Sequence, residues 1–129
     1  MNPDKAKKWL ERVEYDIQTA VAMLEAGRYI YAVFMCQQAL EKSLKAIIAH
    51  KNVEVLPIHN LRRLLEAAGL INNINEEELI KIDFLSQYYI NARYKEDIAE
   101  LSRGMTKEFS AEMIIFTKEM IKWILQEMK

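Results

Sequence analysis

The densest group of chemically useful side chains lies between Tyr88 and Asp97, where three tyrosines accompany one arginine. On a continuous helix Tyr89 and Arg93 share one face, and Tyr94 adds another phenol beside the guanidinium. A guanidinium is always charged and grips phosphate through paired hydrogen bonds, while aromatic rings stack on bases. The stretch therefore predicts a site for a nucleotide or RNA. The alternative is aromatic core packing, with Arg93 paired to Asp97.

A second group of polar residues falls on the helix predicted for residues 29–50. At about 100° per residue, one arc of this helix collects the polar side chains Gln37, Gln38, Glu41, Lys42 and Lys45. Glu41 and Lys45 are spaced i,i+4 in the order that favours a surface ion pair. The arc is either a solvated face or a ligand-binding face, on which Gln38, Lys42 and Lys45 would contact the ligand.

His59 stands directly before a short predicted helix, in the sequence His59-Asn60-Leu61. Asn60 suits the N-cap, because its side-chain oxygen can accept a backbone N–H of the first turn. His59 is either a satisfied connector residue or points across to another helix, where an imidazole can transfer protons near neutral pH.

Composition and charge exclude several classes of protein. Lys and Arg total 18 against 19 Asp and Glu, so the net charge of −1 excludes the broad positive field of a protein that coats nucleic acid. The single cysteine, Cys36, excludes an internal disulfide and a zinc site of several thiolates. The sequence has no Gly-rich phosphate loop, and neither His follows a Glu by three residues, as a di-iron bundle requires. We expect neither a metal nor a cofactor.

The chain has no apolar run long enough for a membrane span. Its longest uncharged stretch is the twelve residues from Tyr29 to Leu40, and no apolar signal core follows Met1. We therefore expect a cytoplasmic protein with no membrane partner.

The periodicity predicts one helical domain over residues 1–129. Three Gly and two Pro are too few for the turns of a sheet protein. Apolar residues at three- and four-residue steps predict helices over 4–26, 29–50, 60–68, 76–92 and 106–128. Gly27 suits the C′ position of the first helix, and Asn75 suits an N-cap before three glutamates that the helix dipole favours.

The last predicted helix carries more apolar surface than one face of a small bundle needs. One apolar row consists of Phe109, Met113, Phe116, Met120 and Ile124, and a second row of Ile114, Ile121, Leu125 and Met128. Surplus apolar surface of this kind is commonly buried between subunits, so we expect a homodimer.

Together these segments resemble the HEPN family, the "higher eukaryotes and prokaryotes nucleotide-binding" domain. The resemblance covers nearly the whole chain and rests on residues 34–46, on His59-Asn60-Leu61 and on Ala92-Arg93-Tyr94. It implies an all-α, up-and-down four-helix bundle with one short additional helix, usually homodimeric. Many HEPN proteins are metal-independent ribonucleases whose site forms at the dimer cleft. Others are non-catalytic, or are partnered with a minimal nucleotidyltransferase, often as a toxin–antitoxin pair.

The sequence departs from the family's nuclease motif, which is Arg, a polar residue, three to five more residues and then His. The positions five to seven before each His are Ser43, Leu44 and Lys45, and Asn52, Val53 and Glu54. None is Arg, and no His follows Arg93. Metal-free RNA cleavage needs a general base and a cation, which only a distant His59 and Arg93 could supply.

Binding is therefore the leading hypothesis: a homodimer whose cleft holds a nucleotide or an RNA segment, with a minimal nucleotidyltransferase as protein partner. Arg93 would anchor phosphate, and Tyr89 and Tyr94 would stack or orient the ligand. The remaining site residues are Gln38, Lys42, Lys45 and His59. One alternative is a divergent metal-independent ribonuclease in which Arg93 stabilises charge and His59 transfers a proton. Another is a dimerising helical adaptor with no small ligand.

Overall fold

The chain folds into helices without strands throughout the part described, which confirms the all-α prediction. The computed structural model describes residues 2–89 and 94–129, with side chains from residue 98 onward in the second range. The elements are α1 (Pro3–Glu25), α2 (Tyr29–His50), α3 (Leu61–Ala67), the 3-10 turn η1 (Ile71–Asn73), α4 (Glu76–Ser86), α5 (Tyr94–Arg103) and α6 (Lys107–Glu127). In these two ranges, no helix has the length and apolar character needed to cross a membrane.

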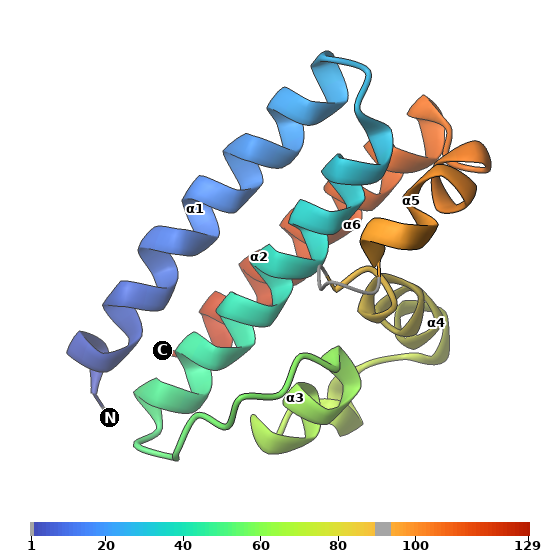
Figure 1. Ribbon diagram of the computed structural model, residues 1–129. Coiled ribbons are helices and arrows are strands. Elements are labelled where there is room, and N and C mark those ends of the chain that lie inside the picture. The colour runs from blue at the N-terminus through green and yellow to red at the C-terminus, as the bar shows by residue number, and fades with distance from the viewer. Residues whose placement is uncertain (1, 90–93) are drawn as a thin grey trace.

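Helix α2 is the centre of the bundle. α1 lies along one side of it, α6 runs behind it, and α3, α4 and α5 lie on the side away from α1 (Figure 1). α2 contacts every other α-helix, because apolar side chains cover most of its circumference. The three long helices and the α4–α5 segment form the bundle, and α3 is the short additional helix.

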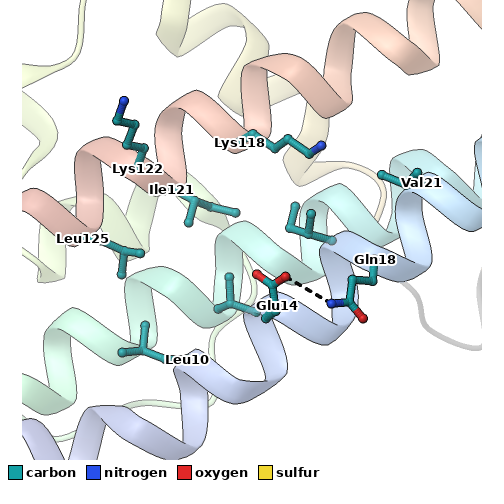
Figure 2. A pocket seen from close by; sticks show the side chains of 10 residues that line it. Leu10, Glu14, Gln18, Val21, Lys118, Ile121, Lys122 and Leu125 are labelled. Carbon is teal, nitrogen blue, oxygen red and sulfur yellow. Dashed lines mark hydrogen bonds between the residues drawn. The ribbon is translucent and has the colours of Figure 1, made fainter.

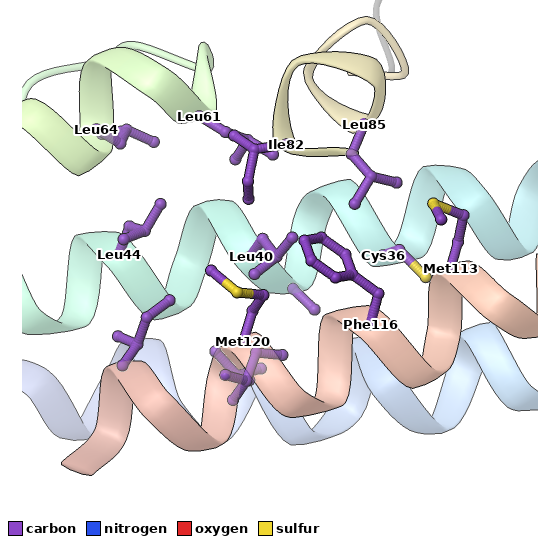
Figure 3. Packing of buried hydrophobic residues seen from close by; sticks show 14 of the residues in the cluster. Cys36, Leu40, Leu44, Leu61, Leu64, Ile82, Leu85, Met113, Phe116 and Met120 are labelled. Carbon is purple, nitrogen blue, oxygen red and sulfur yellow. The ribbon is translucent and has the colours of Figure 1, made fainter. Parts of the chain in front are cut away.

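The core fills the space between α2, α6 and the α3–α4 pair. Leu40 and Leu44 of α2 face Phe116 and Met120 of α6 on one side and the leucines of α3 on the other (Figure 3). The first apolar row predicted on the last helix is buried here at Met113, Phe116, Met120 and Ile124. Cys36 is buried in the same core, as its apolar surroundings in the sequence predict.

The helix ends follow from local hydrogen bonding, and most match the prediction. Asn75 Oδ1 accepts the backbone N–H of Glu78 at 2.8 Å, and the Glu78 carboxylate accepts the N–H of Asn75 at 3.1 Å. This capping box satisfies two of the amides that a helix start leaves unpaired. Gly27 has φ +76°, the left-handed conformation that glycine adopts most readily after a helix. Asn60 Oδ1 accepts the N–H of Arg63 at 3.0 Å and caps α3.

The fourth helix is shorter than predicted. α4 ends at Ser86 rather than at residue 92, so Tyr89 lies in the connector three residues beyond it. Tyr88 is buried in the core, where its ring centroid lies 5.9 Å from that of Phe34 in α2, and the chain leaves the helix here. The predicted face shared by Tyr89 and Arg93 is therefore wrong for Tyr89, because it is not helical. Arg93 lies outside the described residues.

Candidate functional site

A buried carboxylate lies at the centre of the polar residues of α2. Glu41 is 5% exposed, and its Oε1 accepts a hydrogen bond from Gln37 Nε2 at 3.0 Å. Its Oε2 accepts one from Lys45 Nζ at 3.0 Å, and His59 Nδ1 lies 3.0 Å from both carboxylate oxygens. Gln37, Glu41 and Lys45 follow one another at four-residue steps, so helix periodicity places them on one face. We call Gln37, Glu41, Lys45 and His59 the polar cluster.

The cluster keeps Glu41 ionised. Burial raises the pKa of the Glu41 carboxyl, but hydrogen bonds from Gln37, His59 and Lys45, together with the Lys45 charge, outweigh this effect. The pKa therefore lies below its ordinary value. The Lys45 side chain is 6% exposed, so the two charges form an ion pair shielded from water.

Contacts between two connectors bring His59 to this face of α2. The N–H of Leu61 donates to Ser86 Oγ at 2.7 Å, which ties the start of α3 to the end of α4. Gln37 Nε2 also donates to the His59 carbonyl oxygen at 3.2 Å. Tyr89, in the connector after α4, stacks on the His59 ring with 3.8 Å between centroids and 10° between planes. The imidazole is thus held by the carboxylate at one edge and by a phenol on one face.

His59 links the buried cluster to the surface. Its side chain is 37% exposed, whereas the Glu41 side chain is 7% exposed. An ionised carboxylate only accepts hydrogen bonds, so Nδ1 carries the proton that points at Glu41. The exposed part of the side chain lets a ligand reach the ring, and in this tautomer Nε2 carries the lone pair. The arrangement can present a ring nitrogen in a fixed orientation beside an aromatic face.

Side chains of helix α1 contact the two lysines on the polar face of α2. Lys42 Nζ lies 2.6 Å from Oδ2 of Asp16, which is itself buried. The Trp9 ring centroid lies 5.8 Å from Lys45 Nζ and 5.7 Å from Arg12 Cζ. Both lysines predicted for the site are therefore paired with carboxylates. An ammonium carries three donors, so that of Lys42, whose side chain is 20% exposed, can still bind a phosphate oxygen, whereas that of Lys45 is buried.

Five of the seven predicted site residues lie in the polar cluster or directly beside it. Gln38 belongs to it because its Nε2 donates to Gln37 Oε1 at 2.9 Å. The others are Lys42, Lys45, His59 and Tyr89. Arg93 lies outside the described residues, and so does the side chain of Tyr94, the first residue of α5. A solvated helix face is the wrong interpretation for the three buried members, Gln37, Glu41 and Lys45.

The sequence interpretation missed the central role of Glu41, and it missed Trp9 and Asp16 altogether. The i,i+4 spacing of Glu41 and Lys45 is typical of exposed pairs, but an acid on a helix that is apolar at most other positions is a signal of burial. Trp9 and Asp16 lie far from α2 in the sequence, and periodicity carries no information about such contacts. Among residues 2–89 and 98–129, whose side chains the structure describes, no group of three His, Cys, Asp or Glu could hold a metal ion.

The described residues thus form an all-helical bundle whose central helix carries a buried carboxylate, bound by a histidine from a neighbouring connector. The HEPN domain profile matches residues 6–128, so the chain belongs to the HEPN family.

Two solved structures share the fold. TT1696 from Thermus thermophilus is 25% identical, with a TM-score of 0.80 over 98% of this chain and 99% of that chain. ST0689, an archaeal HEPN homologue, is 22% identical, with a TM-score of 0.74 and the same coverage of both chains. No curated protein matches the chain.

Proposed function

We propose that this HEPN protein is a homodimeric module that binds a nucleotide or a segment of RNA. We further propose that it acts with a minimal nucleotidyltransferase in a toxin–antitoxin-type pair. The observation that carries the binding proposal is the partly exposed His59 ring, fixed by the buried Glu41 carboxylate and stacked on Tyr89. Pre-ordered rings of this kind lower the entropy cost of binding a planar ligand.

Rings and amides, rather than a large positive field, would recognise the ligand. Aromatic side chains stack on unpaired bases, and each stacked base is worth about 1–3 kcal/mol. Gln38 adds an amide next to the cluster, and Lys42 and Lys45 add local positive charge that carboxylates already balance. This balance agrees with the net charge of −1 of the whole chain. Arg93 would anchor the phosphate, with Tyr94 beside it in the sequence.

Calorimetric titration with ATP and with a short single-stranded RNA tests the binding proposal. We expect His59→Ala and Tyr89→Leu each to weaken binding at least about tenfold, because each removes one ring of the stack. Arg93→Ala should lower the affinity and flatten its dependence on salt, since a phosphate contact is lost. Tyr31→Leu is the matched control, because Tyr31 is 43% exposed at the far end of α2. The absence of binding by the wild type, or equal affinity in all the variants, would contradict the proposal.

The partner proposal has its own test. We expect a neighbouring gene to encode a minimal nucleotidyltransferase, and co-expression with it, followed by size-exclusion chromatography, should yield a stable complex. If the two proteins elute separately, the partner assignment fails while the nucleotide titration still stands.

The Glu41–His59 contact favours a second candidate, the metal-independent ribonuclease. A carboxylate on Nδ1 orients an imidazole so that Nε2 can transfer a proton. RNA cleavage in the presence of EDTA would support this function if it disappears in both His59→Ala and Arg93→Ala. Cleavage that survives His59→Ala, or that requires a metal, would exclude this mechanism.

A further inference from the structure

Helix α1 carries a second polar surface beside the polar cluster, and this surface contains two hollows. Lys5, Lys8 and Trp9 line a hollow of about 610 Å³ together with the connector that follows α2. Arg12 lines a second hollow, of about 450 Å³, together with Lys42 of α2. Arg12 Cζ lies 5.7 Å from the centroid of the Trp9 ring. The indole of one hollow and the guanidinium of the other are therefore neighbours on one face of α1.

Trp9 adjoins the polar cluster through Lys45. Lys45 Nζ lies 5.8 Å from the Trp9 ring centroid and 3.0 Å from Glu41 Oε2. Both oxygens of the same carboxylate lie 3.0 Å from His59 Nδ1. α1, which carries Trp9, and α3, which His59 precedes, lie on opposite sides of α2 (Figure 1). The two rings therefore border one buried ion pair from opposite sides.

Three positive charges on this surface are available to a phosphate. Lys5, Lys8 and Arg12 are exposed, and no carboxylate among the described residues forms an ion pair with any of them. Lys42 is paired with Asp16, but its side chain is 20% exposed and its ammonium can donate further hydrogen bonds. Acidic side chains also line the hollows and keep the positive potential local, in agreement with the net charge of −1: Asp4, Glu11 and Glu54.

We propose that Trp9 is a second stacking position for a base and that Arg12 binds the phosphate beside it. The ligand of the site is then a single-stranded RNA segment of at least two nucleotides, rather than a mononucleotide. One base stacks at His59 and Tyr89, the strand crosses the polar face of α2 past Lys42, and the next base stacks on Trp9. The inference rests on the proposed function and names the ligand of its site.

Aromatic rings that alternate with separate cations suit a strand of nucleotides. Every base has a π-face, so stacking tolerates any sequence, and a guanidinium matches a phosphate through paired hydrogen bonds. The other flank of α1 differs, because Leu10 lies there in an apolar groove whose α6 side carries Lys118 and Lys122 (Figure 2). None of the described residues that line this groove is aromatic. The Trp9 flank therefore suits a nucleic acid, and the groove supplies control positions.

The fluorescence of Trp9 reports directly on the second stacking position. The chain has two tryptophans, so Trp123→Phe leaves Trp9 as the single indole. The probes are adenosine monophosphate (AMP) and the RNA tetranucleotide tetraadenylate. A base that stacks on an indole quenches its emission, so tetraadenylate should quench Trp9. AMP at saturation should not, because it occupies only the position at His59 and Tyr89.

Calorimetric titration of variants separates stacking from folding. Trp9→Leu should weaken tetraadenylate binding about tenfold and leave the affinity for AMP within about twofold, because one stacked base is lost. Trp9→Phe should recover most of the affinity, since it keeps a ring. Arg12→Gln should reduce the slope of log K against log salt concentration by about 0.7, the value for one phosphate contact on a single strand. Lys122→Gln, which removes an exposed charge at the apolar groove, is the control and should change neither quantity.

The two probes distinguish failure of this inference from failure of the proposed function. Tighter binding of tetraadenylate than of AMP, with these effects of the variants, would support the inference. Equal affinity for the two probes, or unchanged tetraadenylate binding in Trp9→Leu, would overturn it and leave the proposed function standing. Equal weakening of both probes by Trp9→Leu would also overturn it, because the indole would then act through Lys45 and the cluster. If the wild type binds neither probe, the inference and the proposed function fail together.

Discussion

Replacing Glu41 tests whether one buried charge holds the polar cluster together. Glu41→Gln keeps the size of the side chain, and its amide oxygen can still accept the Gln37 N–H. The change removes the negative charge opposite Lys45, whose side chain is 6% exposed. The ammonium would then lie in a poorly solvated position without a counter-charge.

The expected loss of stability can be worked out from this geometry. Breaking a buried ion pair by removing one partner costs about 3–5 kcal/mol. We expect about 3 kcal/mol for Glu41→Gln, at the low end, because the amide keeps one hydrogen bond and partly exposed His59 can turn to water. Lys45→Met should cost less, about 1–2 kcal/mol, because Glu41 keeps two other donors. The double variant should be about 1–3 kcal/mol more stable than the sum of the single losses.

Urea unfolding followed by far-UV circular dichroism measures these values, at one protein concentration so that any association contributes equally. Glu119→Gln, an exposed change on α6, is the control and should stay within about 0.5 kcal/mol of the wild type. A loss below about 0.5 kcal/mol for Glu41→Gln, or additive losses in the double variant, would refute the idea that the cluster is one coupled unit.

Three further perturbations have definite expected outcomes. Because the Glu41 pKa is lowered in the folded protein, its contribution to stability is complete above the ordinary carboxyl pKa and is lost as pH falls through the folded value. Between about pH 5 and pH 3, the free energy of unfolding should therefore fall more steeply for the wild type than for Glu41→Gln, and parallel curves would disprove this. Burial raises the pKa of Cys36 to about 12, so the native protein should react with iodoacetamide at about pH 8 roughly a thousandfold more slowly than the unfolded chain, as mass spectrometry can follow. Comparable rates would mean that the thiol is accessible. Asn75→Ala should cost about 1 kcal/mol in urea unfolding by removing the capping box, whereas Asn72→Ala, an exposed change in η1, should cost little. Equal losses of stability in the two variants would contradict the idea that the capping box stabilises α4.

The sequence predicts those parts of the fold that local physics decides. The bounds of α2 match residues 29–50, because Gly27 ends the previous helix and an unbroken apolar pattern follows. The start of α4 matches because Asn75 and Glu78 cap the helix through atoms three residues apart. Such signals lie within one turn of the chain, so they can be read without knowledge of the fold.

The end of α4 shows where local signals fail. No Gly or Pro occurs between Glu76 and residue 104, and the apolar periodicity continues past the observed end. The helix ends because Tyr88 packs into the core against Phe34 of α2 and Tyr89 stacks on His59, which precedes α3. Both contacts depend on elements distant in sequence. For the same reason, the pairing of Glu41 with His59 could not be predicted from spacing, although both residues stood out individually.

The position of the polar cluster argues for a role beyond stability. Replacing a buried ion pair with apolar side chains of similar volume is often neutral or stabilising, so packing alone does not require Glu41 and Lys45 at the centre of an otherwise apolar helix. The hydrogen bonds of the cluster converge on Glu41. One of its partners is His59, the member of the cluster whose side chain is most exposed. The buried charge therefore fixes the orientation of a ring that faces solvent. A ligand that uses this ring gains from an arrangement already ordered before it binds, and this is the physical reason to place the binding site here.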